Sequence, residues 1–283
     1  MAEVQTQASS ERDEVRAFAR AGTKIHYWTA GPADAPTVVL THGVTLDHGT
    51  YVGQVPGLLA AGYSVVTWDM RGHGISQPMG DRFSIQSAVD DLRVLLDELG
   101  IDEAILVGQS FGGSVIQELY RRHPERVLAL VLVGTPALGE PMPWYHRVFS
   151  RVRPTLLRLW PEGALRRVLP AFMSKKPAVQ RYVAEATRPL SKADFIAVTE
   201  AAVEGLLDLP PLEAVQVPVL ITLGDGEMPL VAGMIDAWQK RDPQVVVERV
   251  EDAGHLANQD NPEAFNRILL EFLRRVVPKD EAG

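Results

Sequence analysis

The segment Gly108-Gln109-Ser110-Phe111-Gly112 carries a serine with a glycine two residues to either side. This pattern is typical of a sharp turn between a strand and a helix that exposes a serine hydroxyl as a nucleophile. The flanking sequence fits, because a buried strand is predicted over residues 104–107 and a helix over residues 112–122. We therefore predict that Ser110 is the nucleophile of an acyl-transfer reaction. The alternative is a serine that only caps a helix.

An activated serine needs a general base, and His255 is the best placed of the seven histidines. It follows a strand predicted over residues 244–250 and precedes the last predicted helix. It should therefore lie at the carboxyl edge of the sheet, on the same edge as Ser110. His73, in the motif Arg71-Gly72-His73-Gly74, is a competing candidate for the base. The remaining histidines are predicted to be structural or solvated: His26, His42, His48, His123 and His146.

The third member of a serine triad orients the imidazole and stabilises its cation. After a serine in this kind of turn, the acid follows in the chain and precedes the histidine. Two carboxylates in Gly224-Asp225-Gly226-Glu227 meet this requirement. The residue pattern does not decide between Asp225 and Glu227, and at least one of them is expected to be a solvated loop carboxylate.

The oxyanion formed in acyl transfer needs backbone N–H donors rather than a particular side chain. The N–H of Phe111, directly after the serine, is one predicted donor. The second is expected from the loop His42-Gly43-Val44, which follows a strand predicted over residues 37–40. We predict that Val44 provides this amide and that His42 supports the loop.

Strand and helix patterns alternate along most of the chain. Strands are predicted at 15–20, 24–29, 37–40, 63–68, 104–107, 127–133, 217–223 and 244–250, and helices at 51–60, 84–99, 112–122, 231–241 and 261–277. This alternation predicts an α/β fold with a mostly parallel central sheet, whose strands end at the edge where catalytic groups gather. We expect a core of residues 15–135 and 212–283, a helical cap of residues 136–211 inserted after the sixth strand, and a mobile polar tail of residues 1–14.

Composition excludes several classes of protein. The 28 Lys and Arg against 36 Asp and Glu give a net charge of −8, which disfavours nucleic acid as a partner. Without cysteine there is no disulfide, thiol nucleophile or cysteine-based zinc site. No metal-ligand spacing, P-loop or dinucleotide motif is present, so no cofactor or metal is predicted. No membrane span or secretory signal is recognised, which predicts a cytoplasmic location, and the sequence does not indicate the oligomeric state.

The predicted cap differs from the rest of the chain in its charge. Residues 140–190 contain ten Lys or Arg and three Glu, so this segment carries a net charge of +7. Such charges usually form the solvated face of amphipathic helices, but they could also attract an acidic substrate, an anionic lipid surface or a partner. Large apolar side chains also occur here, and we expect most to form the core of the cap and a few to face the pocket: Trp144, Tyr145, Phe149, Leu156, Leu159, Trp160, Phe172 and Met173.

Taken together, the His42-Gly43 loop, the segment from Trp68 to Ser76, the serine turn and Ala253-Gly254-His255 resemble the α/β-hydrolase superfamily. The likeness is to its branch of capped serine esterases, perhydrolases (non-haem haloperoxidases) and carbon–carbon hydrolases, and it covers residues 15–277. The resemblance implies Ser110 as nucleophile, His255 as base, and the amides of Val44 and Phe111 as oxyanion donors.

The family's acid usually lies in a Gly-x-x-Asp turn after the strand that follows the cap. Glu227 occupies the position of that aspartate, so the resemblance favours Glu227, with Asp225 as the rival. A glutamate there is a departure from the family pattern. Serine at position 110 separates the chain from relatives that attack with aspartate, the haloalkane dehalogenases and epoxide hydrolases.

These inferences predict a cofactor-independent serine hydrolase that cleaves a small or medium carboxylic ester or lactone through an acyl-enzyme. The same triad could instead perform carbon–carbon bond hydrolysis or perhydrolysis. A third alternative is a ligand-sensing protein of this fold with little turnover, because fold alone does not determine function.

Overall fold

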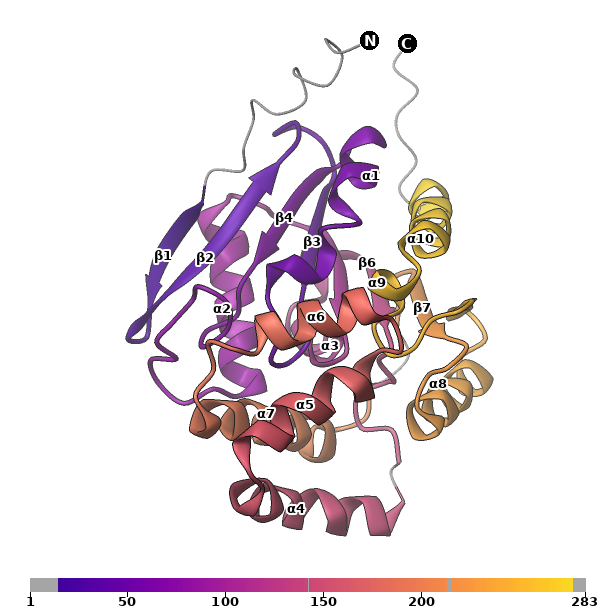
Figure 1. Cartoon of the computed structure of the whole chain (residues 1–283). Coiled ribbons are helices and arrows are strands. Elements are labelled where there is room, and N and C mark those ends of the chain that lie inside the picture. The colour runs from indigo at the N-terminus through magenta and orange to yellow at the C-terminus, as the bar shows by residue number, and fades with distance from the viewer. Residues whose placement is uncertain (1–14, 142, 213–214, 277–283) are drawn as a thin grey trace, which may run out of the picture.

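The computed structural model describes residues 15–141, 143–212 and 215–276 (Figure 1). The predicted tail of residues 1–14 lies outside the described residues. The strands of the described residues form one eight-stranded sheet in the order β1-β2-β4-β3-β5-β6-β7-β8. Their bounds are β1 Arg16–Arg20, β2 Thr23–Ala30, β3 Thr37–Thr41, β4 Ser64–Trp68, β5 Ala104–Gln109, β6 Val127–Val133, β7 Val219–Gly224 and β8 Val246–Val250.

The sheet is mostly parallel, as the alternation of strands and helices predicts. β2 pairs antiparallel with β1 and β4, whereas β4, β3, β5, β6, β7 and β8 pair parallel with their neighbours. The central strands are buried on both faces, which explains the continuous apolar run of Val127–Val133. Their carboxyl ends therefore meet at one edge, where the loops after β3, β5, β7 and β8 come together.

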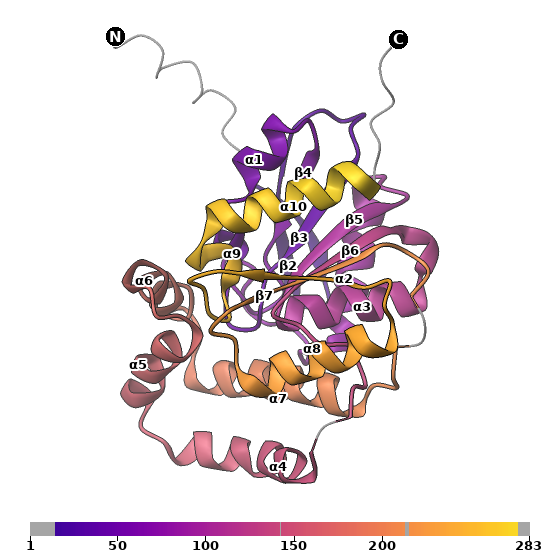
Figure 2. The ribbon, with the colours of Figure 1, turned by 90° about the vertical axis from the view of Figure 1, so that its right-hand side faces the viewer.

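Helices cover both faces of the sheet (Figure 2). Residues of α1 (Val55–Ala60) and α10 (Pro262–Val276) share one buried cluster with the sheet. Residues of α2 (Ile85–Glu98), α3 (Phe111–Arg122) and α8 (Pro229–Arg241) share the cluster on the other face. Short elements complete the core: η1 (His48–Tyr51), η2 (Pro124–Arg126) and α9 (Ala257–Asp260). The prediction of an α/β fold with a helical cap after the sixth strand is confirmed.

Among the described residues between β6 and β7 there are four helices, which we call the cap: α4 Trp144–Leu159, α5 Glu162–Met173, α6 Pro177–Ala186 and α7 Lys192–Asp208. α7 contributes Val198 and Ala201 to the cluster that α2 and α3 also form. α5 and α6 pack on the loops of the core through a small apolar cluster: Leu46, Met173, Val179, Val183, Ala186 and Leu256.

The expectation that the large apolar residues of the cap form its core is wrong for most of them. Met173 is buried, but seven others are exposed: Trp144, Tyr145, Phe149, Leu156, Leu159, Trp160 and Phe172. Five of these seven lie on α4, which sits at the outer edge of the molecule in both views (Figures 1 and 2). Periodicity identifies an amphipathic helix, but it does not say which side of the helix meets the protein.

None of the helices in the described part of the chain combines the length and the apolar character that crossing a bilayer requires.

Candidate active site

Ser110 lies in a strained turn between β5 and α3, with φ 51° and ψ −117°. This conformation is rarely adopted by a residue with a side chain. A Cβ added to Gly108 would lie 2.5 Å from the backbone of Gly112, and one added to Gly112 would lie 2.2 Å from the carbonyl oxygen of Thr41. Glycines therefore allow the strand, the turn and the helix to approach this closely, which is the backbone that the serine motif predicts.

Hydrogen bonds from β6 and the residues after it hold the turn. The N–H of Ser110 donates to the carbonyl of Val133 at 2.9 Å. The hydroxyl of Thr135 donates to the carbonyls of Ser110 at 3.0 Å and Val133 at 3.1 Å. Sequence reasoning did not assign a role to Thr135, whose only signal is its position two residues after the end of β6.

His255 pairs with Glu227 at the carboxyl edge of the sheet. The Nδ1 of His255 lies 2.9 Å from Oε1 and 3.1 Å from Oε2 of Glu227, and both side chains are almost completely buried. A carboxylate only accepts hydrogen bonds, so this contact assigns the proton of the neutral ring to Nδ1. Nε2 is then the unprotonated nitrogen, which is the form that a general base requires.

Gly134 provides room for this pair. It has φ +59°, and a Cβ at this position would lie 2.8 Å from Oε2 of Glu227 and 3.0 Å from Nδ1 of His255. Any larger residue would therefore push the carboxylate or the ring from its place. The longer side chain of glutamate, compared with aspartate, is accommodated beside this glycine.

The carboxylate of Asp225 does not contact His255 and instead binds the backbone of the loop after β8. Its carboxylate oxygens accept the N–H groups of Asp252 at 3.1 Å and Ala253 at 3.2 Å. These backbone donors lower the pKa of Asp225. The structure thus brings Glu227, and not Asp225, to the ring of His255, while Asp225 organises the loop that leads to the histidine.

Gln109 connects the loops around Ser110. Its Nε2 donates to the carbonyl of His255 at 3.3 Å, and its Oε1 occupies the space that a Cβ of Gly43 would need, 2.0 Å away. No hydrogen bond joins the Ser110 hydroxyl to the imidazole of His255 within the described residues. A hydrogen bond between a nucleophile and its general base is often long or absent before substrate binds. Sequence reasoning missed Gln109, although it precedes the serine in the motif.

The two predicted oxyanion donors flank the serine turn. Phe111 is the first residue of α3, so its N–H has no acceptor within the helix and lies at the positive end of the helix dipole. Val44 lies in the loop after β3, where Leu46 donates to Gly43 at 3.2 Å and Thr45 has φ 69°. No hydrogen bond between described residues uses the amide of Val44 or Phe111.

His42 supports the loop that contains Val44. Its Nδ1 donates to the carbonyl of Gly43 at 2.7 Å, and its Nε2 accepts the N–H of Met70 at 3.0 Å. Burial lowers the pKa of His42 to about 4, so its ring is neutral near pH 7. Both ring nitrogens are therefore occupied by structural contacts.

His73, the rival candidate for the base, is fully buried. Its Nδ1 lies 3.0 Å from the carbonyl of Arg71, and its ring packs on His42 and Phe83. Burial, with a contribution from His42, lowers its pKa to about 3. Its Nε2 has no hydrogen-bond partner among the described residues. No carboxylate of the described residues forms a hydrogen bond with its ring, in contrast to the contact of Glu227 with His255.

A cavity of about 300 Å³ opens beside His255, between the end of α5 and the loops after β7 and β8. Met173 and Met228 form apolar parts of its lining, and Lys175 and Asp252 form polar parts. Ser110 does not belong to the lining residues. Within the described residues no group of His, Asp and Glu has the arrangement of a metal site.

Comparisons with known proteins agree with this architecture. The model of one family, described as the alpha/beta hydrolase fold, matches residues 36–262. A 3-oxoadipate enol-lactonase from Acinetobacter baylyi is 26% identical over 254 residues, which cover 89% of this chain and 93% of the relative. A 2-hydroxy-6-oxo-6-phenylhexa-2,4-dienoate hydrolase from Comamonas testosteroni is 28% identical over 272 residues, which cover 89% of this chain and 91% of the relative.

Among solved structures, a thermophilic esterase from Thermogutta terrifontis superposes with a TM-score of 0.76 at 25% identity. The match covers 94% of this chain and 99% of the esterase.

Proposed function

Because the chain belongs to the α/β-hydrolase fold family, we propose that it is a serine hydrolase of small or medium carboxylic esters or lactones. The observation that carries this proposal is the contact of His255 with Glu227, at the sheet edge where the strained turn presents Ser110. A neutral imidazole held by a carboxylate through Nδ1 is the arrangement that activates a hydroxyl nucleophile. The lactonase and the esterase among the similar proteins support the choice of substrate class.

In the proposed reaction, Nε2 of His255 takes the proton of the Ser110 hydroxyl while the oxygen attacks the carbonyl carbon. Glu227 stabilises the imidazolium that forms, and the amides of Val44 and Phe111 donate to the oxyanion. The alcohol then leaves with the proton from His255, and in a lactone it stays tethered to the acyl group. His255 finally activates water, which releases the acid from Ser110.

Carbon–carbon bond hydrolysis on the same residues is the second candidate. It is favoured by the similarity to the 2-hydroxy-6-oxo-6-phenylhexa-2,4-dienoate hydrolase. A panel of p-nitrophenyl esters, lactones and vinylogous diketones separates the two reactions by their relative kcat/KM. Action in the cytoplasm stays a prediction from the sequence.

The test of the mechanism is Ser110→Ala, assayed on this panel together with labelling by a fluorophosphonate. We expect the variant to lose about 10⁴-fold or more in kcat and all of the label. Ser114→Ala is the matched control, because Ser114 lies one turn further along α3 and its hydroxyl makes no hydrogen bond to the described residues. Turnover by Ser110→Ala at the rate of the control would contradict the proposal.

A further inference from the structure

The cap gathers most of the exposed apolar side chains of the molecule. Fourteen large apolar side chains of the described residues are exposed, and ten of them lie between residues 144 and 172. Seven of the ten belong to α4 (Trp144–Leu159), including Leu159 at 79% and Trp144 at 74% exposure. Single exposed apolar residues are ordinary, but a contiguous group on one helix marks a binding surface.

α4 turns its polar side toward the protein and its apolar side outward. The half-buried residues His146, Ser150, Arg153 and Leu157 recur at helical spacing on the inner side. Another side of the helix, which is exposed to solvent and which we call the outer face, carries Tyr145, Val148, Phe149, Val152, Leu156 and Leu159. An amphipathic helix that only covered a protein core would have the reverse orientation.

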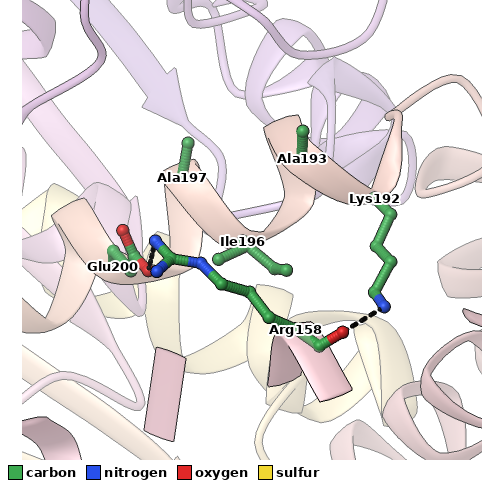
Figure 3. A pocket seen from close by; sticks show the side chains of 6 residues that line it. All are labelled: Arg158, Lys192, Ala193, Ile196, Ala197 and Glu200. Atoms are coloured by element: carbon green, nitrogen blue, oxygen red, sulfur yellow. Dashed lines mark hydrogen bonds and ion pairs between the residues drawn. The ribbon is translucent and has the colours of Figure 1, made fainter. Parts of the chain in front are cut away.

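Polar contacts with α7 fix α4 in this orientation. Arg153 donates to the carbonyl of Thr199 at 2.6 Å. Figure 3 shows the end of α4, where Arg158 pairs with Glu200 at 3.2 Å and Lys192 donates to the carbonyl of Arg158 at 2.7 Å. Because these contacts use the inner side and the end of the helix, the outer face stays free for a partner.

The charged side chains of α4 are all positive, and Glu200 of α7 pairs with one of them, Arg158. Arg147 and Arg151 are exposed, and with Arg158 they form a stripe at helical spacing along one border of that face. α4 contains no acidic residue. A cationic stripe beside an exposed apolar face is the pattern of helices that lie in the plane of an anionic membrane surface.

We propose that the outer face of α4 docks this protein on the surface of a bilayer that contains anionic lipid. The apolar side chains would enter the boundary between headgroups and acyl chains, and the arginine stripe would contact lipid phosphates. The positive charge of residues 140–190, +7 in a chain of −8, orients the cap toward such a surface. Such attachment would not depend on the proposed reaction.

A second copy of the chain is less suited than an anionic bilayer to cover the outer face of α4. A two-fold interface brings the same patch of both subunits together. Pairing of two outer faces would therefore place two arginine stripes at one interface to which α4 supplies no carboxylate. Phosphate groups of lipids supply the missing negative charge.

The test is flotation of the full chain with vesicles of phosphatidylcholine alone and of phosphatidylcholine with phosphatidylglycerol at 3:1. We expect binding to the anionic vesicles to be at least tenfold stronger and to weaken with added salt. The double variant Arg147→Gln/Arg151→Gln should lose about fivefold in partitioning per arginine. Val148→Ser/Phe149→Ser should lose about tenfold or more, because the apolar part of the contact is removed.

Two control variants match these changes outside the cap. Val52→Ser removes an apolar side chain that is 73% exposed, and Arg267→Gln removes an exposed arginine of α10. Both should bind vesicles like the wild type, and thermal unfolding followed by circular dichroism checks that every variant folds. Quenching of tryptophan fluorescence by lipids with brominated acyl chains, absent in Trp144→Phe/Trp160→Phe, would support insertion of the two ends of α4.

A wild-type chain that stays unbound with anionic vesicles would overturn the proposal. Binding that the α4 variants leave at the level of the two controls would do the same. So would a dimer in sedimentation velocity that the α4 variants dissociate while no vesicles are bound, because the second copy would then be the occupant.

Discussion

At the residue scale, the carboxylate of Glu227 is distinguished from that of Asp225 by what each oxygen contacts. Glu227 meets the Nδ1 of His255 and is buried, whereas Asp225 is exposed and accepts two backbone N–H groups. A buried carboxylate that holds one tautomer of histidine contributes to each proton transfer. A carboxylate that caps a loop contributes to local order.

These contacts predict different consequences for two conservative substitutions. Glu227→Gln, which presents an amide to the ring, should lower kcat by about 10²- to 10⁴-fold with a smaller change in KM. Asp225→Asn should lower kcat less than tenfold, because one oxygen acceptor for the loop remains. The measurement is kcat and KM of both variants on one hydrolysed ester, with urea unfolding to compare their stability. Equal losses of kcat in the two variants would contradict the assignment of Glu227.

The same two residues show how far sequence reasoning reaches at this scale. The serine turn and the position of His255 follow from motifs that specify a backbone conformation and a place in the chain. The pattern alone left Asp225 and Glu227 open, because both follow β7 within three residues. Glu227 is distinguished from Asp225 by the length of its side chain and by the space that Gly134 leaves beside His255. The spacing of residues in the sequence shows neither feature.

At the scale of elements, most strands and helices of the core were predictable, whereas the orientation of helices was not. Val127–Val133 forms β6 as predicted, and Ser84 caps α2 in a reciprocal pair of hydrogen bonds with Ser87. The helix predicted over residues 51–60 is instead the turn η1 followed by the shorter α1, which begins next to Pro56. The cap was predicted to be helical, but the apolar side of α4 faces outward because α7 binds its polar side.

The packing of α6 against the loops of the core is a feature at the scale of elements, and it supports the candidate site. α6 places Val183 in a cluster with Leu46 and Leu256. Leu46 lies two residues after Val44, and Leu256 directly follows His255. Tyr182 of α6 also contacts Oδ1 of Asp47 at 3.0 Å. Packing of α6 thus supports the two loops that the proposed reaction uses.

Substituting Val183 tests this support. Val183→Ala should lower the free energy of unfolding by about 2 kcal/mol, because it leaves a cavity between the cap and the loops. It should also lower kcat/KM for the hydrolysed ester. Val168→Ala is the matched control on α5, where the side chain is 46% exposed and the expected change is within about 0.5 kcal/mol. Urea unfolding and steady-state kinetics of both variants provide the comparison. Equal stabilities would contradict the expected contribution of Val183 to the packing of α6 on the loops.

At the scale of the whole molecule, buried neutral histidines link folding to pH. The pKa of His42 is lowered to about 4 and that of His73 to about 3, mainly by burial, from an ordinary value of 6.5. The unfolded chain therefore binds protons that the folded chain does not bind as the pH falls below 6.5. The stability that depends on these two neutral rings is therefore expected to be fully present above pH 6.5 and to be lost as the pH falls toward their lowered pKa values.

His73→Phe tests this linkage, because phenylalanine keeps an aromatic ring between His42 and Phe83 but does not titrate. Between pH 7 and pH 5 each such histidine should cost about 2 kcal/mol of unfolding free energy, so the variant should lose about that much less than the wild type. It should be somewhat less stable at pH 7, where the hydrogen bond to Arg71 is missing. Urea midpoints at the two pH values measure the difference. Added salt should change this difference little, since its cause is burial and not exposed charge. An unchanged pH dependence of stability in the variant would show that His73 does not contribute to it.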